Sequence, residues 1–198
     1  MKKTLGILIL VLFCILINIR WYLFDENQYQ REQQILGISR SHPEATQKTE
    51  EVRSFLQKNM PLSDYFNEKE KQHLEDVQQL IFKGSIMLIM ITLLLPLVIY
   101  NSRKDFKSCI FWAGVILLIV PLLLFLFPFP SLFLGFHKIF FTNDLWLLNP
   151  ETDKLISLFP EQFFRDTFLL IGRNIFLSGV MLMTISYVAN HLVYKDGD

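Results

Sequence analysis

Two histidines and one aspartate are the residues of this sequence best suited to catalysis. His73 lies three residues before Asp76 in EKQHLEDV, and His137 lies in FHKIFF. An imidazole titrates near neutral pH, so it can accept or donate a proton during a reaction. Asp76 could orient His73 and fix its tautomer. Together they predict general acid–base catalysis, with His73 favoured as the base. The plainer alternatives are solvated side chains at 73 and 76 and an interfacial His137.

Other catalytic signatures are missing from the sequence. It contains no G-x-S-x-G, no H-E-x-x-H and no phosphate-binding glycine loop. Cys14 and Cys109 both lie in apolar segments, where a cysteine usually behaves as a small hydrophobic residue. Nucleophilic catalysis by serine or cysteine therefore has no support in the sequence.

The composition is typical of a membrane protein. Of the 198 residues, 52% are hydrophobic and 19 are phenylalanine, which is more apolar than an ordinary soluble domain. Nearly uncharged segments of about 17 or more residues recur, and they predict several membrane-spanning helices. The formal net charge is zero, and no basic run indicates a nucleic-acid partner.

Basic residues indicate which side of the membrane each connection occupies. Lysine and arginine are enriched next to membrane ends on the cytoplasmic side. The residues that fit this rule are Lys2, Lys3, Arg103, Lys104, Lys107 and Lys195. Both termini are therefore predicted to be cytoplasmic. The two longer polar segments are predicted to face outward.

The fold prediction is a mainly α membrane protein, with a bundle of four transmembrane helices and a small extracytoplasmic cap that includes a short β-hairpin. The first apolar segment is interpreted as an uncleaved helix, because aromatic residues rather than a small-residue cleavage site follow it. The predicted segments are transmembrane helices at 1–24, 80–100, 108–130 and 166–193, extracytoplasmic parts at 25–79 and 131–165, a cytoplasmic turn at 101–107 and a cytoplasmic tail at 194–198.

A helix is predicted to carry His73. Asn67 is suited to cap its N-terminus, and Glu70, three residues later, completes a capping box. His73 and Asp76 then share one face of the helix by their spacing. No helix breaker precedes Gly84, so the helix is predicted to continue into the second transmembrane segment.

The outward segment 131–165 is polar yet rich in aromatic residues. A proline-containing turn at 149–153 separates the triplets 146–148 and 154–156, and this pattern predicts the β-hairpin. Four aromatic residues are predicted to lie at the lipid interface or to contact the substrate: Phe136, Phe140, Phe141 and Trp146.

Arg173 lies inside the fourth apolar segment. An ionisable residue is costly there and usually faces the bundle interior. We expect it to support the site by holding a lipid carbonyl or phosphate. The alternative is a side chain that extends to the outer headgroups.

Two other functions fit the same residues. His73, Asp76 and His137 could bind zinc or another divalent ion in a metal-dependent membrane hydrolase. Alternatively, the aromatic segment could be the docking surface of a non-enzymatic membrane subunit. In that case the aromatic residues would matter and the histidines would not.

Several motifs resemble those of the lipoprotein intramolecular transacylase family. They are EKQHLEDV at 70–77, FHKIFF at 136–141, WLLNP at 146–150 and LISLFPEQFF at 155–164. The predicted layout of four spans and two outer segments also resembles that family.

The resemblance implies a multi-pass enzyme of the Gram-positive plasma membrane with its active site at the extracytoplasmic face. The implied substrate is a membrane-bound lipoprotein whose N-terminal cysteine carries a diacylglyceryl group. The implied reaction moves the sn-2 acyl chain to the α-amino group of that cysteine and gives the lyso form. His73 and His137 correspond to the family's catalytic pair, and neither a cofactor nor a metal is implied.

Overall fold

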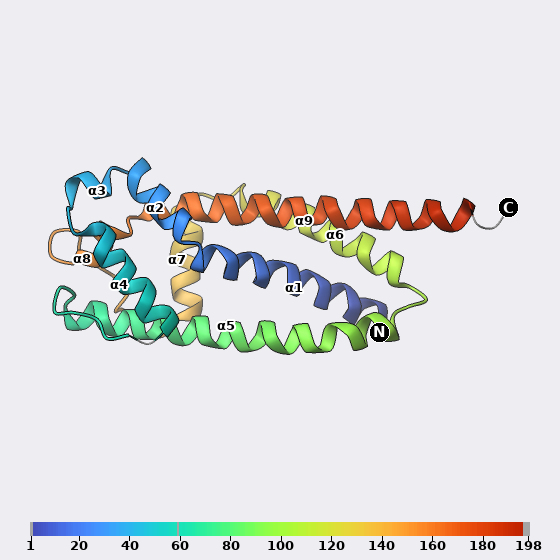
Figure 1. Ribbon diagram of the computed structural model, residues 1–198, viewed down its shortest axis with the longest axis horizontal. Helices are drawn as coiled ribbons and strands as arrows, with labels where there is room; N and C mark the ends of the chain where they lie inside the picture. Colours follow the sequence, from blue (N-terminus) through green and yellow to red (C-terminus); the bar gives the residue numbers. More distant parts are fainter. Residues whose placement is uncertain (1, 59, 196–198) are drawn as a thin grey trace. The chain divides into compact units, whose positions relative to one another are not determined.

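The computed structural model describes residues 2–58 and 60–195, which form helices joined by short connections (Figure 1). Four of these helices are long and apolar enough to cross a membrane. They are α1 (Lys2–Phe24), α5 (Glu68–Asn101), α6 (Phe106–Leu124) and α9 (Glu161–Lys195). The shorter helices are α2 (Glu26–Ile35), α3 (Ile38–Ser41), α4 (Ala45–Lys58), α7 (Phe129–Phe140) and α8 (Lys154–Leu158). Residues 196–198 of the predicted tail lie outside the described residues.

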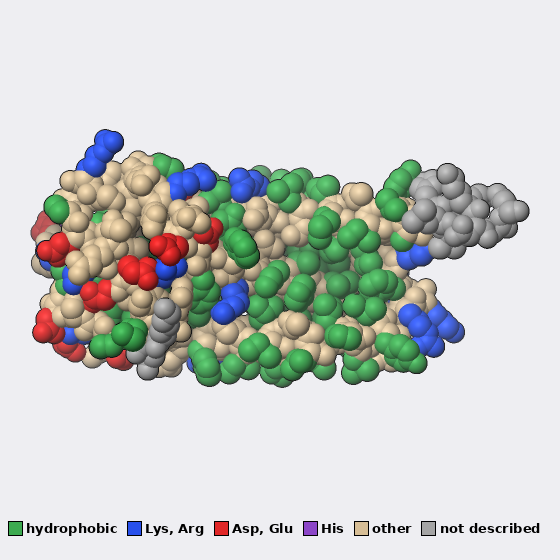
Figure 2. Space-filling model, in the orientation of Figure 1, with side chains coloured by type: hydrophobic (Ala, Val, Ile, Leu, Met, Phe, Trp, Pro, Cys, Tyr) green, Lys and Arg blue, Asp and Glu red, His purple; other side chains and the backbone are tan. Residues whose placement is uncertain are grey.

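The chain divides into two units. The bundle unit comprises residues 1–20, 85–127 and 169–198, and the polar unit comprises residues 21–84 and 128–168. Hydrophobic side chains are spread over the visible surface of the bundle unit, whereas acidic side chains gather over the polar unit (Figure 2). A surface rich in exposed leucine, isoleucine and phenylalanine suits a lipid environment.

Close helix packing holds α6 and α9 together in the bundle unit. A Cβ atom added at Gly114 would lie 2.9 Å from the Gly179 carbonyl oxygen, and one added at Gly179 would lie 2.8 Å from the Gly114 oxygen. The two backbones therefore meet directly, a packing mode that small residues permit between membrane helices. Buried Ala113 and Leu117 contribute to the adjoining core.

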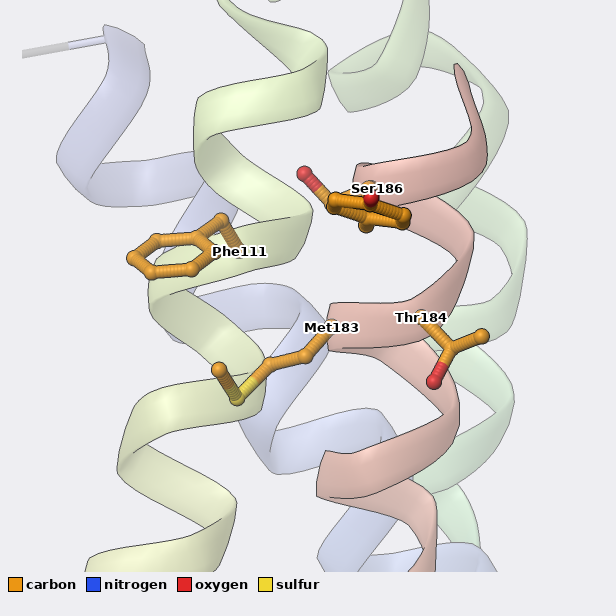
Figure 3. Close-up of a pocket in the computed structure, with 5 residues that line it drawn as sticks. Phe111, Met183, Thr184 and Ser186 are labelled. Atoms are coloured by element: carbon orange, nitrogen blue, oxygen red, sulfur yellow. The ribbon is translucent and has the colours of Figure 1, made fainter. Parts of the chain in front are cut away.

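A groove of about 370 Å³ lies further along the same two helices, lined by Phe111, Met183, Thr184, Ser186 and Tyr187. Met183 extends from α9 towards α6 beside this groove (Figure 3). The Ser186 hydroxyl donates to the Lys107 carbonyl at 2.9 Å. None of these five lining residues is a histidine or a carboxylate.

The polar unit has a hydrophobic core of its own. Residues from α3, α4, the start of α5, α8 and the start of α9 meet in it (Figure 1). Its buried members are Ile38, Ala45, Val52, Phe55, Phe66, Leu74, Leu155, Leu158, Phe159 and Phe163. Because Leu74 follows His73 directly, this core fixes the part of α5 that carries the histidine.

The predicted capping box at the start of α5 is confirmed. The Asn67 side-chain oxygen accepts from the Glu70 backbone N–H at 2.9 Å. Glu70 Oε2 in turn accepts from the Asn67 backbone N–H at 2.7 Å. The helix then runs without interruption past Gly84, as the sequence predicts.

The predicted β-hairpin is wrong. Residues 154–156 belong to helix α8, and 146–148 form a turn and an irregular stretch, so neither triplet is a strand. The turn instead closes on itself, because the Asn149 carbonyl accepts from the Asp153 N–H at 2.8 Å and Asp153 Oδ2 accepts from the Asn149 N–H at 2.7 Å. Asp153 then precedes the first residue of α8, where an aspartate favours a helix start.

Two prolines lie at the start of the helix that follows α6. The third apolar segment, predicted to run from 108 to 130, is helical only to Leu124, and a new helix begins at Phe129. Pro128 lies at the N-cap of α7 and Pro130 lies in its first turn, positions where the missing N–H costs little. The segment predicted as an aromatic loop therefore begins as a helix.

Candidate active site

Helix α5 positions His73 through its anchored first turns. Glu70 is fully buried, and its Oε1 accepts from the Leu155 backbone N–H at 2.6 Å. Asn67 Nδ2 also donates to Asp153 Oδ1 at 2.9 Å. These bonds tie the start of α5 to the start of α8. His73, one turn after Glu70, is consequently held in place with only 8% of its surface exposed.

Helix α7 positions His137 and fixes its tautomer. His137 is also 8% exposed, and its Nδ1 lies 2.8 Å from the Phe133 carbonyl oxygen, one turn earlier. A carbonyl oxygen can only accept a hydrogen bond, so Nδ1 carries the hydrogen. The lone pair of the neutral ring is therefore on Nε2, which makes this atom the proton acceptor.

The two imidazoles lie together inside a group of aromatic rings. Their ring centroids are 6.2 Å apart, and the planes differ by 33°. The Phe141 and His73 ring centroids are 5.3 Å apart, and the rings meet edge to face at 70°. Around His137 lie Phe133 at 4.2 Å and Trp146 at 4.9 Å, with Phe136 and Phe141 both at 5.5 Å.

Burial keeps both imidazoles neutral. His73 lies in the charged first turns of α5, before the apolar stretch of that helix. Burial, with a further contribution from His137, lowers the pKa of His73 to about 4, although the charge of Asp76 opposes the shift. Burial also lowers the pKa of His137, opposed by its bond to Phe133. Both rings are thus in the neutral form that can accept a proton at pH 7.

Asp76 contacts a residue that sequence reasoning missed. Its Oδ2 accepts from Asn143 Nδ2 at 2.8 Å. The Asn143 carbonyl accepts from the Trp146 indole N–H, also at 2.8 Å. Meanwhile, His73 Nδ1 is buried and has no hydrogen-bond partner within the part of the chain that the structure describes. Asp76 therefore reaches the site through Asn143 and Trp146, and its influence on His73 is through charge.

The other predicted site residues take different positions. Phe141 is buried against both histidines, whereas Phe136 and Phe140 are 44% and 52% exposed. Phe136 still touches His137 and Phe140. Arg173 belongs to the bundle unit, where it is exposed and donates to Asn174 Oδ1 at 3.4 Å. Its support of the site stays a prediction.

The donor groups do not form a metal site in the described parts of the chain. Among the side chains that the structure describes, those of residues 2–57 and 60–189, no three His, Cys, Asp or Glu groups lie close enough to hold a metal ion. The two histidines lie among aromatic carbon atoms, and Asp76 is bonded to Asn143. The arrangement fits proton transfer in a largely apolar enclosure.

A family model identifies the chain. The model of the lipoprotein intramolecular transacylase Lit matches residues 4–164. The chain belongs to this family. The Lit family is one of acyltransferases that act on lipoproteins, so this chain is an acyltransferase rather than a non-enzymatic docking subunit. A search of curated protein sequences gave no match.

Solved Lit structures from Bacillus cereus have the same fold. The membrane integral transacylase matches with a TM-score of 0.84 and 19% identity, over 98% of this chain and 95% of that chain. A variant with a histidine changed to arginine matches with a TM-score of 0.75 and 21% identity, over 98% of this chain and 92% of that chain. A variant with a histidine changed to alanine matches with a TM-score of 0.77 and 19% identity, over 98% of this chain and 93% of that chain. With its four apolar helices, the chain is a multi-pass membrane protein.

Proposed function

We propose that this Lit-family chain moves the sn-2 acyl chain of a diacylglyceryl-modified lipoprotein to the α-amino group of its N-terminal cysteine. The product is a lyso-form lipoprotein that carries one chain on nitrogen and one on glycerol. The observation that carries the proposal is the enclosed pair of neutral imidazoles, His73 and His137, in a chain of this family.

The reaction needs no external reactant. The amine nitrogen bonds to the sn-2 carbonyl carbon, the bond from that carbon to the glycerol oxygen breaks, and one proton moves from nitrogen to the released oxygen. An ester becomes a more stable amide, so neither a nucleotide nor a cofactor is required. An α-amino group has a pKa near 8, so part of it is already nucleophilic at neutral pH. Holding amine and ester together supplies much of the rate, because effective molarities in such reactions are large.

His137 is the proposed proton carrier. Its Nδ1–H is held by the Phe133 carbonyl, so Nε2 is free to take the proton from the attacking amine and deliver it to the glycerol oxygen. A backbone acceptor that fixes the tautomer plays the role that a carboxylate plays in other histidine bases. This assignment reverses the one that the sequence favoured, in which Asp76 supported His73 as the base.

His73 is the proposed donor to the developing oxyanion. Its low pKa, about 4, keeps the ring neutral, and a neutral imidazole carries one N–H and one lone pair. A buried N–H without a partner is costly, so the unpartnered Nδ1 is assigned the lone pair and Nε2 the hydrogen. Nε2–H would then bond to the carbonyl oxygen as it gains charge in the tetrahedral intermediate.

The proposed location follows from charge and substrate. Basic residues flank the membrane ends at both termini and in the turn between α5 and α6, so we place them in the cytoplasm of a bacterial plasma membrane. The histidines are then at the extracytoplasmic face, where a lipoprotein anchored in the membrane lipid presents its N-terminal cysteine.

Mass spectrometry of one lipoprotein tests the proposal. Its N-terminal lipopeptide is isolated from cells that lack N-acylation, with and without this protein. Production of an isomer of the same mass, with fragments that place one acyl chain on nitrogen, is expected only when the protein is present. Both chains remaining on glycerol, with the enzyme present in the membrane, would overturn the proposal. Metal addition and chelation are run alongside, because a hydrolase would instead release a fatty acid and lower the lipopeptide mass.

A further inference from the structure

Trp146 lies against the ring of His137 at a distance suited to stabilising positive charge. The indole and imidazole centroids are 4.9 Å apart, and the planes are inclined by 34°. Tryptophan is the aromatic residue that attracts a cation most strongly over its face. The contact therefore favours the imidazolium that forms when His137 takes a proton, in an enclosure that otherwise disfavours charge.

Two hydrogen bonds hold the indole in this position. Trp146 Nε1–H donates to the Asn143 carbonyl, and the Asn143 side chain donates to Asp76 Oδ2, each at 2.8 Å. The Asn143 side-chain oxygen also accepts from the Leu145 N–H at 3.1 Å, which shapes the turn that leads to the tryptophan. A residue of α5 is thereby connected to a ring that touches the histidine of α7.

We propose that Asn143 is a positioning residue, which uses Asp76 as its anchor to hold Trp146 against His137 and so stabilises the protonated intermediate. This inference rests on the proposed function of His137 as proton carrier. The described hydrogen bonds of Asn143 go to Asp76, Leu145 and Trp146, and none goes to an imidazole. It acts through the indole. Other titratable groups near the relay include His73 of α5, 6.2 Å from His137, and Lys69 of the same helix, whose charge acts on His73. Asp144, next to Asn143, and Lys138 of α7 are both exposed.

Exchanging the side chains at positions 76 and 143 tests the hydrogen bond between Asp76 and Asn143. Asn143→Asp places a carboxylate against Asp76 and removes the donor. The double variant Asp76→Asn with Asn143→Asp restores the bond in the opposite direction, since the new amide can donate to the new carboxylate. It keeps the net charge and the acceptor for Leu145. Asp144→Asn is the matched control, because it changes a neighbouring exposed charge outside the relay.

The first measurement is the rate of lyso-lipopeptide formation at saturating substrate. Asn143→Asp should lower it about 2- to 30-fold, the range of one cation–π contact. The double variant should recover most of the loss, and Asp144→Asn should match the parent. A rate for Asn143→Asp equal to that of the control, or a double variant no better than the single one, would overturn the proposal.

The second measurement needs no substrate. With Trp21→Phe and Trp112→Phe, Trp146 is the single tryptophan, and a protonated imidazole in contact with an indole quenches its fluorescence. In the parent background, Trp146 emission should fall on acidification. In Asn143→Asp the emission should no longer depend on pH, and in the double variant the pH dependence should return. Acid quenching that is unchanged in Asn143→Asp would refute the relay. Because this result does not depend on acyl transfer, it separates failure of the relay from failure of the proposed reaction.

Discussion

The bundle unit and the polar unit both connect distant segments by hydrogen bonds, but they use different acceptors. In the bundle, the Ser186 hydroxyl of α9 donates to the backbone carbonyl of Lys107 in α6. In the polar unit, the carboxylate of Asp153 accepts from Asn67, and that of Asp76 accepts from Asn143. A backbone carbonyl is present at every position, whereas a carboxylate acceptor needs one particular side chain. The two histidines therefore lie in the unit where carboxylates connect distant segments.

The strongest way to break this comparison is to remove the histidines. His73→Ala and His137→Ala should each lower the rate of lyso-lipopeptide formation about 10²- to 10⁴-fold, the usual contribution of a positioned acid or base. Ser186→Ala is the matched change in the bundle, where it removes a bond to the Lys107 carbonyl. It should leave the rate near that of the parent. Equal losses in all three variants, at equal amounts in the membrane, would show that the polar unit has no special role.

The buried carboxylate of Glu70 is the next test. Glu70→Ala leaves the backbone N–H groups of Asn67 and Leu155 without their acceptor. Each lost bond to a charged group costs about 1.5–3 kcal/mol, so the purified protein should unfold at a clearly lower temperature in detergent. Glu75→Gln, on an exposed position of the same helix, should change the unfolding temperature little. A Glu70 variant as stable as this control would contradict the role assigned to the α5–α8 connection.

Two glycines offer opposite tests of packing. Gly114→Ala in the bundle unit places a Cβ atom 2.7 Å from Met183 Cγ and 2.9 Å from the Gly179 oxygen, and such overpacking costs about 1–3 kcal/mol. Gly84→Ala, in the polar unit's part of α5, meets nothing within 4 Å and should stabilise the helix by about 0.5–1 kcal/mol. Thermal unfolding of both variants shows whether each substitution raises or lowers the stability. The same sign for both would remove the role given to close packing of α6 and α9.

Local patterns were predictable from the sequence, and distant pairings were not. The capping box of Asn67 and Glu70 depends on residues three apart, and it was predicted correctly. The β-hairpin prediction was wrong because a turn between two short, mostly apolar segments does not distinguish a strand from a short helix such as Lys154–Leu158. Once α7 is known to be a helix, the bond from His137 to Phe133 follows from its i−4 spacing.

Asp76 acts on His73 through its charge, as the sequence suggested, but its described hydrogen bond is to another residue. Its spacing from His73 suggested a direct role in orienting the imidazole, yet the structure bonds it to Asn143, 67 positions away in the sequence. A single sequence contains no signal for such a pairing. The connection from Glu70 to Leu155 has the same character, because only half of the Glu70 carboxylate is used by the local cap.

The smallest predicted effect concerns the charge around His73. Burial disfavours the charged ring, so the proton binds only at low pH, and the pKa falls to about 4. His137 contributes to this lowering, so His137→Gln should raise the pKa of His73. Asp76 opposes the lowering, so Asp76→Asn should lower the pKa further. NMR titration of labelled histidine rings in detergent measures both changes, with His73→Gln used to assign the signal.

A histidine free in solution titrates near pH 6.5, whereas the His73 signal should remain in the neutral position at pH 5.5. If the two substitutions moved the pKa in the same direction, local unfolding rather than charge would be the cause, and the electrostatic part of the comparison would fail.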